Sequence, residues 1–528
     1  MSENGKVRLP AGWAWTTIGE ITEPTVDQSG PGGTDDFLYV DISSIDNRAK
    51  KIVSPKSILV AQAPSRARQH LRAGDMVVSM TRPNLNAVAM VPVNMEHAIS
   101  STGLLVLRTN TVHPAWLYYL VQTDAFISAM SRLVLGVLYP AVRPKDICSY
   151  TIPLAPRPEQ HRIIAEVEKQ FTRLDAGIAA LERARANMKR YRASVLKAAC
   201  EGRLVPTEAE SARAEGRDYE PADRLLARIL KERCAKWESD QLARRQAQGK
   251  VPKDNKWKEK YEEPAGPDTT DLPELPEGWM WCSLGQVFEV DVGATPSRAK
   301  KEYWNGNIPW VSSGEVAFCR IRKTRETITE LGLANSSTKI HPLGTVLIGM
   351  IGEGKTRGQV AILDIPACNN QNSAAIRVFE TGLPPEYVYR YLEGQYERNR
   401  QLGSGNNQPA LNKSRVQEIL FPLAPLAEQH RIVSELERRL SVIDELESVV
   451  SANLKRAERL RQSILKRAFE GKLVPQDPKD EPASVLLERI RAERAGREMV
   501  GATGRSPLQA GSKKRNSRVS EMQAALFR

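Results

Sequence analysis

The feature that most constrains this chain is an internal repeat that involves both of its halves. Residues 153–206 and 422–475 align without a gap at a constant offset of 269 residues, and 23 of the 54 aligned positions are identical. The similarity continues in two further pairs of segments, 9–21 with 275–287 and 220–233 with 481–494. Because 528 residues are too many for one hydrophobic core, the repeat predicts two similar units related by a pseudo-twofold axis.

The most similar segments are predicted to be long helices. In the first, apolar side chains step by three and four residues, as in a coiled-coil seam: Ile164, Val167, Phe171, Leu174, Ile178 and Leu181. The second has the same pattern: Val433, Leu436, Leu440, Ile443, Val450, Leu454 and Ala457. Each begins after Pro-Leu-Ala-Pro and ends at a glycine, Gly202 or Gly471. We expect helices of about 42 residues that pair as an antiparallel coiled coil; the alternative is that each helix packs only on its own neighbouring block.

Between these helices the two halves diverge, from about residue 21 to 151 and from 288 to 421. Both blocks contain short apolar stretches separated by Gly, Pro and Asn, which predicts strands with a few short helices. The expected fold class is therefore α+β, with two globular domains joined by two long helices. The expected boundaries are 1–152 and 273–421 for the globular domains, 153–244 and 422–498 for the helical regions, 245–272 for a linker, and 499–528 for a disordered basic tail.

The charge balance is basic, with 76 Lys and Arg against 63 Asp and Glu and a formal charge of +13. A basic surplus suits a polyanionic partner but does not by itself establish one. The cysteines lie far apart without a C-x-x-C pair, so reduced thiols are expected rather than a zinc site or disulfides. No apolar run is long enough to span a membrane and the N-terminus lacks an apolar signal core, so we expect a cytoplasmic protein.

One motif suggests catalysis. Gly349-x-x-x-x-Gly354-Lys355-Thr356 matches the phosphate-binding P-loop pattern, in which a helix must follow the Thr. Here an apolar strand-like stretch, QVAIL, follows almost at once, and a parallel crossover needs a dozen or more residues. A β-hairpin with a basic, glycine-rich loop is therefore favoured, and nucleotide binding is kept as an alternative. No metal-binding or nuclease-like cluster is evident, so no catalytic residue is expected.

Two divergent blocks, each followed by a helix that opens P-L-A-P-x-x-E-Q-H-R-I and closes before L-V-P, resemble the layout of type I restriction-modification specificity subunits. The resemblance extends over nearly the whole chain. It implies that the blocks are target-recognition domains for double-stranded DNA and that the chain is not itself an enzyme. The helices would space the domains and dock two modification (methyltransferase) subunits and the restriction (motor) subunits. S-adenosylmethionine, ATP and Mg would belong to those partners, and none to this chain.

The expected DNA-contacting residues are loop residues with forked, amide or hydroxyl side chains, because Arg reads guanine, Asn and Gln read adenine, and Lys, Ser and Thr bind phosphate. In the first block they are Arg82, Asn84, Asn86, Tyr139 and Arg143. In the second they are Ser312, Ser313, Lys355, Thr356, Arg357, Gln371, Asn372, Asn406, Asn407 and Gln408. The expected partner-docking residues are those of the E-Q-H-R motif: Gln160, His161, Arg162, Gln429, His430 and Arg431.

Three other functions are considered. The chain could serve a modification system of another type, it could be a P-loop ATPase acting through Lys355, or it could be a structural coiled-coil scaffold. Neither of the last two explains why the helical frame repeats while the loops diverge. Different loop residues in the two blocks imply an asymmetric, bipartite DNA target.

Overall fold

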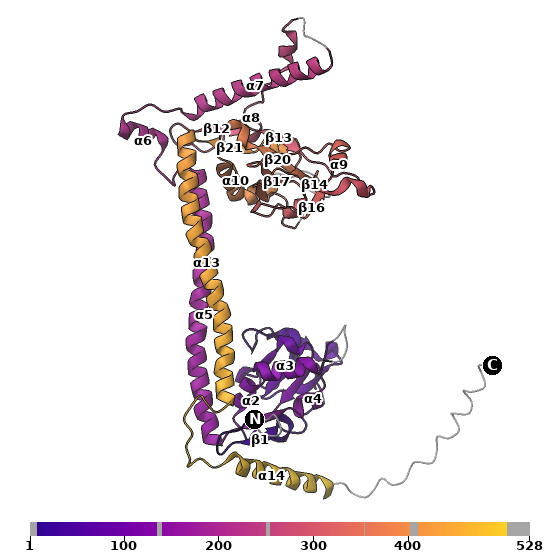
Figure 1. Cartoon of the computed structure of the whole chain (residues 1–528). Coiled ribbons are helices and arrows are strands. Elements are labelled where there is room, and N and C mark those ends of the chain that lie inside the picture. Colours follow the sequence, from indigo (N-terminus) through magenta and orange to yellow (C-terminus); the bar gives the residue numbers. More distant parts are fainter. Residues whose placement is uncertain (1–7, 135–139, 250–253, 353, 402–409, 504–528) are drawn as a thin grey trace, which may run out of the picture. The chain divides into compact units, whose positions relative to one another are not determined.

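The computed structural model describes residues 8–134, 140–249, 254–352, 354–401 and 410–503. The chain divides into two compact units, which are treated separately below (Figure 1). The first unit contains Met1–Leu181 and Ala452–Arg528, and the second contains Glu182–Ser451.

The globular domain of the first unit is built on two small sheets. One has the strand order β10-β7-β8, with β7 (Met76–Ser79) between β10 (Leu104–Leu107) and β8 (Val88–Met90), and both pairings are antiparallel. The other has the order β5-β2-β9-β6 and contains β5 (Lys56–Leu59), β2 (Asp36–Val40), β9 (Ile99–Ser101) and β6 (Ala67–His70). Every residue of β7 is buried, which explains why its first three residues are all apolar rather than alternating with polar ones.

Short elements complete this domain. β1 (Ala14–Thr17) pairs antiparallel with β11 (Thr151–Leu154), so the two ends of the domain meet immediately before the long helix. The remaining strands and α-helices are β3 (Ile45–Asp46), β4 (Lys51–Ile52), α1 (Ile18–Ile21), α2 (Pro114–Leu120), α3 (Asp124–Arg132) and α4 (Pro144–Cys148). Proline opens α2 and α4, where a missing backbone N–H costs nothing, and the Thr123 hydroxyl caps α3.

The globular domain of the second unit has the same plan with a larger sheet. Its five-stranded sheet has the order β13-β20-β17-β18-β15: β13 (Glu289–Val292), β20 (Ser373–Arg377), β17 (Val346–Gly349), β18 (Val360–Leu363) and β15 (Cys319–Ile321). A three-stranded sheet contains β16 (Glu326–Ile328), β14 (Trp304–Val311) and β19 (Cys368–Asn369). β12 (Met280–Ser283) pairs with β21 (Leu420–Leu423) as β1 does with β11. The helices are α8 (Leu284–Val287), α9 (Glu330–Ala334), α10 (Pro385–Gly394), α11 (Tyr396–Gln401) and α12 (Lys413–Gln417).

The repeated segments form α5 (Arg157–Cys200) and α13 (Leu426–Phe469), each of 44 residues. In the first unit, Val167 and Phe171 of α5 share a core with Ile464 and Leu465 of α13. In the second, Leu196 of α5 shares a core with residues 436, 440 and 443 of α13. The two helices thus pack on each other as well as on the domains, which confirms the α+β prediction and excludes packing on a neighbouring block alone.

Two ion pairs show the direction in which the helices run. Asp175 pairs with Arg461 in the first unit, and Arg192 pairs with Asp444 in the second. Residue numbers rise along α5 while they fall along α13, so the helices are antiparallel. Asp175 and Asp444 are equivalent in the repeat, as are Arg192 and Arg461, so each repeat supplies one acid and one base to the other.

A further helix follows each long helix and covers its nearest domain. α7 (Ala222–Ala247), preceded by α6 (Glu208–Glu215), contributes Leu225 and Ile229 to the core of the second unit. α14 (Ala483–Thr503) contributes Leu487 and Ile490 to the core of the first. The predicted linker carries a short helix at Lys256–Lys260 whose Trp257 stacks on Trp237 of α7, with ring centroids 6.0 Å apart. The basic tail, with Lys513, Lys514 and Arg515, lies outside the described residues.

Gly177 lies in the middle of α5 with open space around its Cα. Gly177→Ala is therefore expected to raise the free energy of unfolding by about 1 kcal/mol, because glycine loses more backbone entropy than alanine in a helix. Thermal denaturation of the two proteins checks this, with Ala180→Gly as the reverse change in the same helix. A lower melting temperature for the alanine variant would contradict the packing around α5.

The described segments contain neither a candidate membrane-spanning helix nor a candidate metal-binding cluster. No helix there is long and apolar enough to cross a membrane. Within those same segments, no group of three or more His, Cys, Asp or Glu side chains is arranged to hold a metal ion. All six cysteines are described and none is in a disulfide, and reduced thiols stay a prediction.

Candidate nucleic-acid interface

In the first unit, the loop between β7 and β8 carries exposed polar side chains. Arg82 has a left-handed backbone (φ 51°) and precedes a single helical turn, Pro83–Leu85, on which Asn84 is exposed. The segment that enters α4 runs alongside: Val142 N donates to Met80 O (2.9 Å), and Arg82 N donates to Pro140 O (2.8 Å). The backbone therefore brings Arg82 close to the start of α4, where Arg143 is also exposed.

In the second unit, the loop between β17 and β18 has an equivalent frame. Leu411 N donates to Met350 O (2.9 Å), as Val142 does to Met80 in the first unit. Met350 N donates to Asn372 O (2.8 Å), and Met80 N likewise donates to Gly103 O (3.2 Å). The backbone scaffold at the loop is thus the same in both units, whereas the exposed side chains differ.

This second loop is the P-loop-like sequence, and it is a hairpin. β17 and β18 are antiparallel neighbours, and no helix follows Thr356 in residues 357–363, all of which are described. The loop is held from α11, because Tyr396 Oη donates to Lys355 O (2.7 Å) and Arg400 Nη1 donates to Gly354 O (2.9 Å). The arrangement leaves the Lys355 side chain exposed and lacks the helix N-terminus that a nucleotide phosphate requires.

The expected DNA-contacting residues fall into three groups by exposure. Exposed residues are Arg82, Asn84, Arg143, Lys355 and Gln371. Half-buried residues are Ser312, Ser313, Thr356 and Asn372, and buried residues are Asn86 and Arg357. Tyr139, Asn406, Asn407 and Gln408 lie outside the described residues.

Several of these side chains already have partners within the protein. The Asn86 side chain is buried, its amide nitrogen donates to Val121 O (2.8 Å) and its amide oxygen accepts from Lys50 Nζ (2.9 Å), so we withdraw it from the base-contacting residues. At the start of a helical turn, Glu315 Oε2 accepts from both the Ser312 hydroxyl (2.9 Å) and Ser312 N (3.0 Å), so this serine is engaged within the protein. Arg143 forms a salt bridge with Asp146 (3.0 Å), and Gln371 accepts a hydrogen bond from Thr295. Arg82, Asn84 and Lys355 remain the exposed side chains on which base or phosphate contact is expected.

Comparison with known proteins identifies the family. The family described as "Type I restriction modification DNA specificity domain" matches residues 276–456. The EcoDI specificity subunit of Escherichia coli is 23% identical over 404 residues, which cover 74% of this chain and 79% of that protein. The MjaIX specificity subunit of Methanocaldococcus jannaschii is 27% identical over 228 residues, 42% of this chain and about half (49%) of that protein's length.

Solved structures agree over most of the chain. The HsdS subunit of Thermoanaerobacter tengcongensis is 26% identical, with a TM-score of 0.50 over 89% of this chain and 99% of that one. A chain from work on "complex assembly" of "the type I R-M system" is also 26% identical, with a TM-score of 0.67 over 88% of this chain and 100% of that one. The chain belongs to the type I specificity subunits.

Specificity subunits are the DNA-specificity components of type I restriction-modification systems and are themselves non-catalytic. Members of this family bind no cofactor themselves. The family thus agrees with the predicted class of function and disagrees with the P-loop ATPase alternative.

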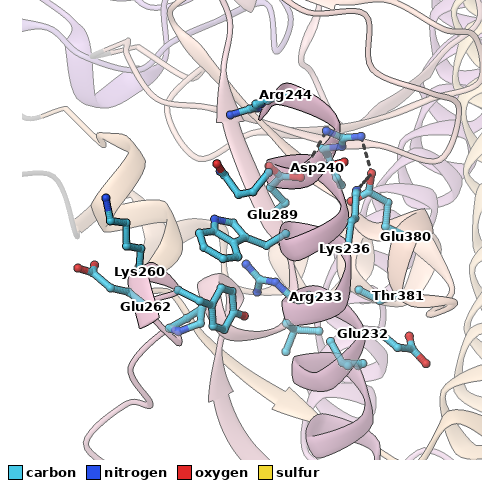
Figure 2. Close-up of a pocket in the computed structure, with 17 residues that line it drawn as sticks. Glu232, Arg233, Lys236, Asp240, Arg244, Lys260, Glu262, Glu289, Glu380 and Thr381 are labelled. Atoms are coloured by element: carbon cyan, nitrogen blue, oxygen red, sulfur yellow. Dashed lines mark hydrogen bonds and ion pairs between the residues drawn. The ribbon is translucent and has the colours of Figure 1, made fainter. Parts of the chain in front are cut away.

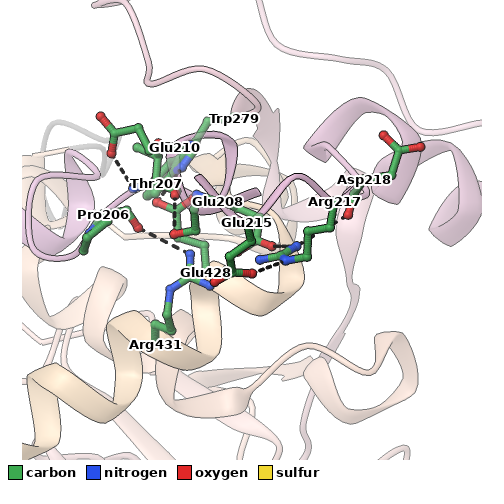
Figure 3. A network of polar contacts seen from close by, with 11 residues as sticks. Pro206, Thr207, Glu208, Glu210, Glu215, Arg217, Asp218, Trp279, Glu428 and Arg431 are labelled. Atoms are coloured by element: carbon green, nitrogen blue, oxygen red, sulfur yellow. Dashed lines mark hydrogen bonds and ion pairs between the residues drawn. The ribbon is translucent and has the colours of Figure 1, made fainter. Parts of the chain in front are cut away.

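In this specificity subunit, the E-Q-H-R motif forms a joint between helix and domain (Figure 3). In the second unit, Glu428 accepts hydrogen bonds from Trp279 Nε1 (3.0 Å) and Glu208 N (2.8 Å). Arg431 pairs with Glu208 at 2.5 Å. The joint therefore connects the start of α13, the start of the domain and the segment that follows α5.

The joint of the first unit has the same construction. Glu159 accepts from Trp13 Nε1 (3.0 Å), and Arg162 pairs with Asp480, which follows α13 (2.6 Å). The recurrence of this bond explains why both halves have a tryptophan at this place, Trp13 and Trp279. The sequence did not predict these Trp–Glu hydrogen bonds, because nearly 150 residues separate the two partners in each pair.

The expected partner-docking residues differ in exposure and in their contacts at these joints. Gln160 and Gln429 are fully buried and donate to Ala155 O (2.9 Å) and Ala424 O (2.8 Å), so they hold the helix starts and cannot contact a partner. Arg162 and Arg431 are used in the ion pairs described above. His161 and His430 are exposed and stay predictions for docking.

Burial raises the pKa of Glu428 to about 7, although its bonds from Glu208 N and Trp279 oppose this shift. The folded protein therefore keeps a proton that the unfolded chain loses near pH 4.5. The resulting stability is fully present below pH 4.5 and is lost as the pH rises through 7, on the order of 3 kcal/mol. Glu428→Gln is expected to remove this dependence in the second unit. Denaturant unfolding from pH 4.5 to 8 measures it, with Glu437→Gln as the exposed control on α13; an unchanged slope would contradict the assignment.

A polar pocket of about 470 Å³ lies between α7 and the second domain (Figure 2). Its charged side chains pair with one another across the interface: Lys236 of α7 contacts Glu380 at 2.7 Å. Arg233 donates to Gly285 O (2.7 Å) and Gln286 O (2.5 Å). These contacts fasten α7 to the domain.

Proposed function

We propose that each unit of this specificity subunit reads one half of a bipartite DNA target with the loop that follows its central buried strand. The observation that carries the proposal is that both loops have one backbone frame and different exposed side chains. The first loop carries Arg82 and Asn84, whereas the second carries Lys355 and Thr356. Different side chains on one frame favour two unlike half-sites, hence an asymmetric target.

The chemistry of these loops fits duplex DNA. Arg and Asn form paired hydrogen bonds with guanine and adenine edges in the major groove, and Lys and Thr bind phosphate oxygens. The net charge of +13 adds a salt-dependent attraction that does not depend on sequence.

The remaining features of the proposal follow from the family. The recognition domains are proposed at 1–152 and 273–421, with two modification subunits and the restriction subunits docking on the helical regions, in the cytoplasm. S-adenosylmethionine, ATP and Mg would be bound by those partners. Exposed His161 and His430, which occupy equivalent positions in the repeat, support two equivalent docking sites.

The test is co-expression with the modification subunits, followed by single-molecule sequencing of host DNA for modified adenines. One bipartite motif with two unlike halves is the expected result. An assembled complex with the methyl donor present that leaves DNA unmodified, and that binds no DNA in a salt-dependent manner, would contradict the proposal.

A further inference from the structure

The reading loop of the first unit is fastened by a lysine that is remote in sequence. Lys50 lies in the turn between β3 and β4, 36 residues before Asn86. Its ammonium group donates to Asn86 O (2.5 Å) and to Asn86 Oδ1 (2.9 Å). The backbone of Lys50 is held in turn, because Tyr118 Oη of α2 donates to Lys50 O (3.0 Å).

Asn86 connects this lysine to the body of the domain. Its side chain is buried, and its Nδ2 donates to Val121 O (2.8 Å) at the end of α2. Its backbone N donates to Pro83 O (3.0 Å) and closes the helical turn that carries Asn84. Asn86 is therefore the point at which the loop is attached both to Lys50 and to α2.

Two residues of the loop, Arg82 and Asn86, have positive φ angles of 51° and 47°, and Lys50 in the neighbouring turn has φ 54°, although none of the three is glycine. Such conformations are unfavourable for side-chain-bearing residues and persist where surrounding contacts impose them, frequently at functional sites. Burial also lowers the pKa of Lys50 to about 8, so the ammonium group has given up water for its contacts with Asn86.

From these contacts we infer that Lys50 and Asn86 are positioning residues for recognition of the first half-site. They hold Arg82 and Asn84 in the orientation needed at base edges and do not contact DNA themselves. The inference rests on the proposed function, because it supposes that this loop reads DNA. A displacement of the order of an ångström is enough to break paired hydrogen bonds, so loosening the loop costs specificity without removing a reading side chain.

The experiment uses the complex assembled with its modification subunits, carrying Lys50→Gln or Asn86→Ala. Methylation rates are compared on the target DNA and on duplexes with single changes in either half-site. We expect discrimination at several positions of the first half-site to fall about tenfold, while discrimination in the second half-site and affinity for non-specific DNA stay unchanged. Lys51→Gln, an exposed neighbour in β4, is the matched control and should leave both half-sites unaltered.

Substituting a residue that contacts a base and substituting a positioning residue should affect different numbers of positions in the half-site. Asn84→Ala is expected to relax one position sharply, whereas Lys50→Gln relaxes several positions together. If Lys50→Gln and Asn86→Ala both behave as Lys51→Gln does, the inference is overturned. It is also overturned if they weaken both half-sites equally along with a lower melting temperature. If Arg82→Ala and Asn84→Ala leave the first half-site unchanged, the proposed function of the loop fails instead.

Discussion

Replacing Arg82 with alanine is expected to relax recognition at one position of the first half-site and to leave the second half-site unchanged. Arg82 is exposed on the loop after β7, and its backbone is fixed by the bond to Pro140 O. A paired contact between arginine and guanine contributes about 1–3 kcal/mol of discrimination, which is roughly a 5- to 150-fold preference. Sequencing of modified adenines in cells that express the variant complex gives the altered motif directly.

Two variants serve as controls for Arg82→Ala. Arg72 is also exposed but precedes the opposite end of β7, so Arg72→Ala should leave the motif unchanged. Lys355→Ala in the second loop should affect only the second half-site. If Arg82→Ala and Arg72→Ala give the same motif as the unaltered chain, Arg82 does not read DNA.

Replacing Gly471 with alanine is expected to destabilise the first unit by about 3 kcal/mol, because backbone strain and overpacking add. Gly471 has φ 66°, and an added Cβ would lie 2.4 Å from Pro10 Cγ and 3.1 Å from Trp13 Cζ2. Gly202 occupies the equivalent place in the second unit, with Pro276 Cγ at 2.5 Å and Trp279 Cζ2 at 3.1 Å. Gly202→Ala is therefore expected to destabilise the second unit instead.

Hydrogen exchange resolves the two units in one protein. Gly471→Ala should accelerate exchange in peptides from residues 8–134, and Gly202→Ala should accelerate it in peptides from 275–401. Gly216 has nearly the same backbone (φ 65°) but open space around its Cα, so Gly216→Ala costs only the backbone strain. Equal effects of Gly216→Ala and Gly471→Ala would show that the end of α13 is not packed on Trp13.

The joints explain how a repeat can be similar in its helices and divergent in its loops. Each joint uses residues from both repeats, as when Arg431 pairs with Glu208 and Arg162 pairs with Asp480. A change at such a residue disturbs a contact between repeats, whereas a change at Arg82 or Lys355 leaves the frame intact. Substitutions in the loops therefore leave the packing of the helices and joints unchanged in both units.

Much of the architecture follows from local patterns in the sequence. The three-and-four spacing of apolar residues from Ile164 to Leu181 predicted a helix of about 42 residues, and α5 has 44. The short connection after Thr356 favoured a hairpin over a P-loop, and β17 and β18 are antiparallel. Within the seam, Ile164, Val167 and Phe171 are buried, but Leu174, Ile178 and Leu181 are only half-buried. Periodicity predicts which face of a helix is packed against other segments, but it does not predict how deeply each side chain on that face is buried.

By itself, the sequence determined the repeat, the long helices, the α+β blocks and the hairpin, because each depends on residue spacing and backbone sterics within a short segment. Only the tertiary structure decided which loop residues are available to DNA. Asn84 and Asn86 are two positions apart and equally suited to read adenine, yet one is exposed and the other is buried against Val121 and Lys50. That difference arises from segments remote in the sequence, whose packing a local pattern does not encode.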